Sequence, residues 1–239
     1  FSSHNYYQHH STSSEGHALA WVDISTGAFH VMPMKPARLG PELARLMPSE
    51  LVVSEAKEAE LRELVSDFDI ALTPIARSAF DSSSAEKRVC DLFGIGSLDA
   101  FGSFERADIS AMGAIIDYLE ITQKGKLPLL RPPQKEAEAR SVQIDAATRR
   151  NLELTHALTG GRAGTLLSVM DKTVTAGGAR LLERRISSPS RVLETIQSRL
   201  DAISFAYDTP SIRNDIRQHL RNVPDLDRAL SRLSLDRGG

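Results

Sequence analysis

The residue of this chain that comes closest to a catalytic group is Asp23, a carboxylate directly before a Ser25-Thr26-Gly27 turn. Carboxylates that converge at the end of a strand can hold Mg²⁺ and activate water for phosphodiester cleavage. Glu55 and Asp69 are the partners that we consider for such a nuclease site. The competing interpretation is an aspartate that caps the amides of its own turn. We favour the turn, because one sequence cannot show that carboxylates converge.

Other catalytic motifs are incomplete. The only Gly-Lys pair, Gly125-Lys126, is followed by Leu127 and lacks the earlier glycine of a P-loop, so the chain alone cannot be a P-loop ATPase. The glycines of the segment 160–164 follow a predicted helix, which indicates a turn and not a dinucleotide site. No serine lies in a G-x-S-x-G elbow. We therefore predict no catalytic, cofactor-binding or metal-ligating residue.

Residues 1–16 are polar and rich in serine and histidine, with His4, His9 and His10 close together. A metal site would need further ligands at a defined spacing, which this stretch lacks. We predict a flexible tail or an added segment without function over residues 1–16. An alternative for Asn5-Tyr6-Tyr7 is the remnant of a first strand.

The composition is that of a globular protein, with 41% apolar and 25% charged residues. Apolar runs fall far short of the roughly 20 residues that cross a bilayer, so we expect no membrane contact. Cys90 is the single cysteine and no secretory leader opens the chain, which favours the cytoplasm. Neither terminus resembles a natural chain end. We therefore expect an excised piece of a longer protein.

Charge is distributed unevenly, with a net −8 over the first 125 residues and +6 over the rest. A basic second half is compatible with approach to nucleic acid, although arginines on solvated helix faces are the more common case. Glu153 and Glu183 lie within helical reach of some of these arginines and offer ion pairs instead. The arginines considered for phosphate contact are Arg149, Arg150, Arg180, Arg184 and Arg185. Base stacking is not expected, because aromatic residues are nearly absent from this half.

Apolar periodicity predicts an α/β domain over residues 17–126. Two apolar runs around Gly27 indicate a β-hairpin, and later strands alternate with helices. The expected strands are 17–24, 28–32, 50–54 and 70–75, and the expected helices are 43–47, 57–65, 85–93 and 110–124. A serine of the 82–84 run is the expected cap of the third helix, and Gly125 the stop of the last.

Three prolines in the stretch 127–133 exclude a helix and indicate the connection between two domains. After a strand-like stretch at 141–144, the remainder of the second domain, residues 127–239, is predicted to be helical. The expected helices are 146–158, 176–186, 191–207, 210–220 and 226–233, with caps at Asp145, Thr175, Ser190, Thr209 and Asp225. The third helix has one continuous apolar face.

The order of several sequence elements resembles the MutS family of DNA mismatch repair proteins. Asp145 to Leu154 and Leu166 to Leu182 resemble the start of that family's core (lever) domain, and Asp23 to Phe29 looks like an element of its connector domain. Three further stretches follow in the family's order: 184–189, 196–203 and 223–233. The resemblance extends from about residue 17 to the end. Gly102-Ser103-Phe104-Glu105 has the wrong place and spacing for the family's mismatch-reading wedge.

The resemblance implies a ribonuclease H-like α/β connector without nuclease activity, followed by part of an all-α lever. It implies that the parent protein couples the binding of mismatched double-stranded DNA to the activity of an ATPase that uses ATP and Mg²⁺. Both functions belong to domains that are not among these residues. It further implies MutL as a partner of the connector and a homodimeric parent. The fragment itself is then non-catalytic; a stand-alone Mg²⁺ nuclease that uses Asp23 is the alternative.

Overall fold

A computed structural model describes residues 4–10, 16–66, 68, 70–123, 127–137 and 141–234, with only the backbone at 4–10 and 234. The chain divides into two compact units. An α/β unit comprises Phe1–Glu138 together with Leu230–Gly239, and a helical unit comprises Ala139–Ala229. The Pro-rich stretch therefore groups with the α/β unit, whereas the sequence placed it at the start of the helical domain. Each unit is described by itself below.

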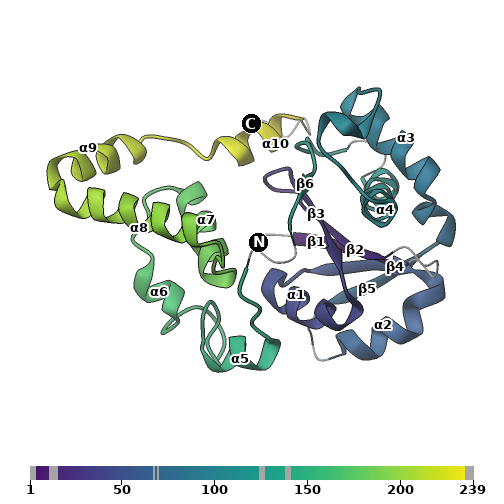
Figure 1. Cartoon of the computed structure of the whole chain (residues 1–239), viewed down its shortest axis with the longest axis horizontal. Helices are drawn as coiled ribbons and strands as arrows, with labels where there is room; N and C mark the ends of the chain where they lie inside the picture. The colour runs from purple at the N-terminus through teal and green to yellow at the C-terminus, as the bar shows by residue number, and fades with distance from the viewer. Residues whose placement is uncertain are drawn as a thin grey trace. The chain divides into compact units, whose positions relative to one another are not determined.

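The α/β unit is built on a sheet whose described strands lie in the order β5-β4-β1-β2-β3-β6 (Figure 1). β1, β2 and β3 form an antiparallel meander, while β1–β4, β4–β5 and β3–β6 are parallel pairs. The strands are β1 His4–His10, β2 His17–Asp23, β3 Ala28–Met34, β4 Glu50–Ser54, β5 Ala71–Ile75 and β6 Gln134–Lys135. The predicted hairpin and α/β class are confirmed for the described residues.

The prediction of a flexible tail is wrong for His4–His10, because these residues form β1 between β2 and β4. The alternative of a strand at Asn5-Tyr6-Tyr7 is the one that the backbone pairing supports. The strand was missed because its histidines and polar neighbours give no apolar alternation. Residues 1–3 and 11–15 lie outside the described residues.

Helices cover both faces of the sheet. Successive residues of a strand point to opposite faces, so β2 contributes Ala18, Ala20 and Val22 to one apolar layer and Leu19 and Trp21 to the other. The first layer packs against α3 and α4, and the second against α1 and α2 (Figure 1). The helices are α1 Leu39–Leu46, α2 Glu58–Val65, α3 Ser82–Phe93 and α4 Arg106–Thr122, and the 3-10 turns are Pro36–Arg38, Glu55–Lys57, Arg77–Phe80 and Leu98–Ala100.

The helical unit contains helices joined by turns, which is the fold class predicted for it. Its helices are α5 Ala146–Asn151, α6 Leu166–Met170, α7 Ala176–Ser187, α8 Leu193–Asp208, α9 Pro210–Leu220 and the first part of α10 Leu226–Ser234. α5 is shorter than predicted, because Glu153 takes a left-handed φ of 45° and its carbonyl accepts from Leu166 N, so the chain turns back on itself. The stretch 141–144 is not a strand: Ser141 makes one isolated bridge to Ser190.

Capping residues were predicted with mixed success. Asp145 and Thr175 accept from the amides of Thr148 and Gly178 and cap α5 and α7 as expected. The cap of α3 is Asp81 and not a serine, since its carboxylate accepts from Ser84 N. Ser190 lies before the start of α8. Thr209 is the N-cap residue of α9 with Pro210 after it, as predicted, but its hydroxyl donates to Phe205 O and makes no cap bond. Gly125, the expected stop of α4, lies outside the described residues.

None of the helices in the described part of the chain is both long and apolar enough to span a bilayer.

Candidate coupling site on the exit segment

Asp23 is fully engaged by its own turn. Its Oδ1 accepts from Ser25 N at 2.9 Å and Ser25 Oγ at 2.7 Å, and its Oδ2 accepts from Thr26 Oγ1 at 2.8 Å. The main-chain carbonyl of Asp23 accepts from Thr26 N and Gly27 N. Both carboxylate oxygens are thus bonded within the turn, which leaves a poor metal ligand.

The carboxylates considered as partners of Asp23 do not form a metal site with it. Glu55 accepts from Arg77 N at 3.4 Å, and Asp69 lies outside the described residues. Among the residues that the structure describes, no three His, Cys, Asp or Glu side chains group so as to hold a metal ion. The geometry therefore does not favour the nuclease alternative.

Gly27 joins the Asp23 turn to the segment that leads out of the α/β unit, residues 127–137, here called the exit segment. Gly27 has a φ of 70°, and a Cβ at this position would lie 2.1 Å from Leu129 O. Arg131 N donates to Gly27 O at 2.8 Å. Only glycine permits both the left-handed backbone and this close approach. The turn therefore fixes the first part of the exit segment.

The middle of the exit segment is held by a strand and by an ion pair to a buried aspartate. β6 pairs with β3, and Glu136 N donates to Val31 O at 2.8 Å. Lys135 Nζ lies 2.7 Å from Oδ2 of Asp108, a buried residue in the first turn of α4. The same Asp108 oxygen accepts from Glu105 N at 3.0 Å, in the capping box of α4. Removing one partner of such a pair would leave a buried charge uncompensated.

The end of the exit segment is held by a charge network on α1. Arg45 donates to Glu42 Oε2 at 2.5 Å and Glu136 Oε2 at 3.4 Å, while His30 Nδ1 lies 3.5 Å from Glu136 Oε1. The Arg45 guanidinium also lies over Trp21, 5.3 Å from the ring centroid. Glu42 is buried, and both Arg38 and Arg45 form ion pairs with its carboxylate. The exit segment thus contacts the α/β unit at several places between residues 129 and 136.

The helical unit has its own anchors close to where the chain enters it. Val142 N donates to Pro189 O at 2.8 Å, and Arg149 Nη2 donates to Ser187 O at 2.9 Å with the arginine buried. These bonds tie the beginning of the unit to the end of α7. Displacement of residues 141–149 would therefore act directly on α7.

A second anchor of the helical unit joins α7 to the start of α10. Arg180 makes a two-pronged contact with Asp225, at 2.8 and 2.9 Å, and a third contact with Asp227 at 3.3 Å. Hydrogen bonding to Arg180 lowers the pKa of Asp225, and the same bonding raises the pKa of Arg180. Sequence reasoning offered Glu183 to some of the arginines and missed this pair, because Asp225 and Asp227 lie 45 and 47 positions away from Arg180.

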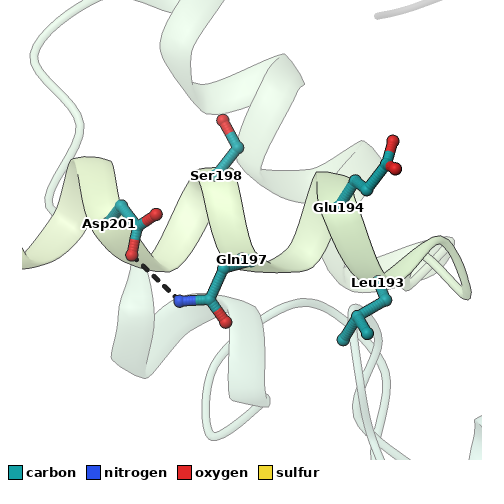
Figure 2. Close-up of a pocket in the computed structure, with 5 residues that line it drawn as sticks. All are labelled: Leu193, Glu194, Gln197, Ser198 and Asp201. Carbon is teal, nitrogen blue, oxygen red and sulfur yellow. Dashed lines mark hydrogen bonds between the residues drawn. The ribbon is translucent and has the colours of Figure 1, made fainter.

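The remaining candidate residues are not brought together into a reactive site. The glycines of 160–164 lie in the turns between α5 and α6, so they form a helix-to-helix turn, as predicted. Arg162 within this turn pairs with Glu183 at 2.7 Å. A hollow of about 510 Å³ runs beside α8, and Figure 2 shows that all five of its lining residues come from that single helix. Its carboxylates do not converge on one point; Gln197 donates to Asp201 Oδ1 at 3.0 Å. The Gly125-Lys126 pair lies outside the described residues.

Comparison with known proteins identifies both units. A model of MutS domain II matches residues 7–131, and a model of MutS domain III matches residues 147–239. The protein "DNA mismatch repair protein MutS" of Roseobacter denitrificans is 66% identical over 98% of this chain. The proteins of the same name from Ruegeria pomeroyi and Cereibacter sphaeroides are 61% and 63% identical over 99% and 93% of it.

The α/β unit and the helical unit thus match two consecutively numbered domains, II and III, of one protein family. The chain belongs to the MutS family. It covers only 25 to 27% of the length of these curated relatives.

Proposed function

We propose that this part of the protein couples two distant sites of a full-length mismatch repair protein, without catalysis of its own. Other domains of the homodimeric parent bind mismatched double-stranded DNA and contain the ATPase site. The α/β unit is the connector and the helical unit is part of the lever. Rigid elements with defined anchors can transmit displacement between sites, so that binding at one biases the other.

The observation that carries the proposal is the attachment of the exit segment. The Gly27 contact, β6, the Lys135–Asp108 pair and the Arg45–Glu136 pair hold it to the α/β unit at four places. After residues 138–140, the chain is bonded again at the end of α7, where Val142 N donates to Pro189 O and Arg149 donates to Ser187 O. A loose tether would have required none of these contacts, since polar linkers function without them.

Three finer points belong to the same proposal. The connector has a ribonuclease H-like topology, which the antiparallel meander β1–β3 beside parallel β4 and β5 supports. It also contributes to recruitment of the MutL partner, for which its net negative charge is suitable. ATP and Mg²⁺ are bound elsewhere in the parent, because the sequence contains no P-loop.

The test replaces Lys135 by methionine in the full-length protein, which keeps the length of the side chain and removes its charge. We expect mismatch-stimulated ATPase activity to fall several-fold, while basal ATPase activity and mismatch affinity change less than about twofold, because coupling and not binding is lost. The matched control is Lys87→Met, which removes an exposed lysine from α3. An unchanged stimulation in a folded Lys135→Met protein would refute the role of the exit segment.

A further inference from the structure

The turn at residues 23–27, here called the 23–27 turn, accepts hydrogen bonds from two segments that lie far apart in the sequence. Gly27 O accepts from Arg131 N of the exit segment at 2.8 Å. Ile24 O accepts from the hydroxyl of Ser231, in the last part of α10, also at 2.8 Å. Ser231 is buried, and all four residues belong to the α/β unit. One turn of this unit therefore holds both the exit segment and the end of α10.

The two segments are the places where the chain passes from one unit to the other. The exit segment is followed by the boundary between Glu138 and Ala139, and the second boundary lies inside α10, between Ala229 and Leu230. Because α10 is one continuous helix, the second passage is not a loose loop. The chain therefore has two connections between its units, and the 23–27 turn bonds to both of them.

In the helical unit, both connections are attached to α7. The bonds from Val142 and Arg149 to the end of α7 hold the residues that follow the exit segment. Arg180 of α7 holds the start of α10 through its two-pronged contact with Asp225. A single connection allows one body to rotate about it, whereas two connections that are held at both ends oppose that rotation. α7 and the 23–27 turn are therefore the two elements at which a displacement can enter both connections together.

The hydroxyl of Ser231 is well placed to transmit a movement of α10. A serine within a helix commonly bonds to a carbonyl of the preceding turn or to water. The hydroxyl of Ser231 donates to Ile24 O, 207 positions away, on a turn whose carboxylate and main chain are bonded internally. Along α10, Ser231 lies four residues after Asp227, roughly 6 Å or little more than one helical turn. Because Asp227 contacts Arg180, α10 has little length over which to bend between its two anchors.

We propose that the 23–27 turn couples the two connections, and that Ser231 is a positioning residue for the stimulation of the parent's ATPase activity by mismatched DNA. This inference rests on the proposed function and adds a second route to that of the exit segment. A displacement of α7 enters both connections, and the turn keeps their ends at a fixed spacing. Loss of the Ser231 hydroxyl frees the end of α10, so the displacement is lost as rotation about the exit segment.

The first experiment replaces Ser231 by alanine in the full-length protein. We expect mismatch-stimulated ATPase activity to fall about threefold, while basal ATPase activity and mismatch affinity change less than about twofold, because transmission and not binding is lost. Ser231→Thr, which keeps the hydroxyl, should restore most of the stimulation. The matched control is Arg232→Ala, which truncates an exposed neighbour on the same helix and should leave the stimulation unchanged. Full stimulation in a folded Ser231→Ala protein would overturn the inference.

A double variant tests whether the two connections act as one loop. Either change alone opens that loop, so Ser231→Ala combined with Lys135→Met should lose no more stimulation than the more damaging single variant. Losses that multiply would mean independent routes and would overturn the shared turn. A loss with Lys135→Met but not with Ser231→Ala would refute the present inference alone. If neither change reduced the stimulation, the proposed function would fail as well.

Amide hydrogen exchange in the full-length protein gives a second measurement, which does not depend on ATPase activity. Loss of the Ser231 bond should loosen the 23–27 turn, so exchange should become several-fold faster in peptides that contain Arg131, far from the substitution in the sequence. Peptides from α4 are the internal control, because its core residues should keep their protection. Faster exchange confined to α10 would mean that the bond supports only its own helix, and faster exchange throughout the α/β unit would mean a general loss of stability. Either result would overturn the inference.

Discussion

The two units differ in how far the apolar side chains of their helices are buried. In α4 of the α/β unit, Ile115, Ile116 and Leu119 are completely buried between α3 and the sheet. In α8 of the helical unit, side chains of the same kind are mostly exposed. Both helices have an apolar face in the sequence, so the difference lies in what is available to cover that face. The α/β unit buries its apolar faces in a core of its own, whereas the described helical unit leaves the apolar side chains of α8 exposed.

The largest expected effect contrasts one core residue of α4 with one exposed leucine of α8. In the 239-residue chain, Ile115→Ala should lower the free energy of unfolding by about 2–5 kcal/mol, because it removes buried methylenes and leaves a cavity. Leu200→Ala should change it by less than about 0.5 kcal/mol. Urea unfolding followed by Trp21 fluorescence and by helical circular dichroism measures both. A comparable cost at Leu200 would show that this side chain is buried in solution.

A second, smaller effect tests how tightly the complete core is packed. Gly113 of α4 crosses α3 so closely that a Cβ would lie 2.2 Å from the Cβ of Ala85. Gly113→Ala should therefore cost about 1–3 kcal/mol through overpacking. Gly96→Ala is the matched control, since nothing lies within 4 Å of its added Cβ and its φ is unexceptional. Equal stability of the two variants in urea would mean that the helices separate without cost.

The smallest expected effect concerns the Arg180–Asp225 pair, which holds the helical unit together by charge. The pKa of Asp225 is lowered in the folded chain, chiefly by its hydrogen bond to Arg180. Its stabilisation is therefore present above the unfolded pKa and is lost as pH falls through the lower, folded pKa. The loss should stay within about 1 kcal/mol, because solvent screens the pair.

The measurement for this pair is thermal unfolding of the helical signal between about pH 2 and pH 6, at low and high salt. Asp225→Asn should flatten the acid limb of the stability curve, while Glu194→Gln, which removes an exposed carboxylate of α8, should leave it unchanged. If the Asp225→Asn variant still lost stability as the pH falls, the stabilisation would come from another carboxylate.

Sequence reasoning predicted the elements whose signals are local. The hairpin around Gly27 follows from alternation and a turn glycine, and the caps Asp145 and Thr175 follow from residue type and position. The contacts of the exit segment were not predicted. Glu136 meets Arg45 across 91 positions, and nothing in the residues near either side chain indicates that meeting. The same holds for β1, whose place is determined by the strands on both sides.

The position of β6 in the sequence has a consequence for the order in which the protein is made. Strands β1 to β5 emerge from the ribosome well before Gln134–Lys135, so β3 remains an open sheet edge during that interval. An open edge is a template for pairing with another chain. Asp108 is also without Lys135 until then. The described sheet is therefore completed only when the first residues of the connection to the next unit have been synthesised, which places the last strand pairing at the domain boundary.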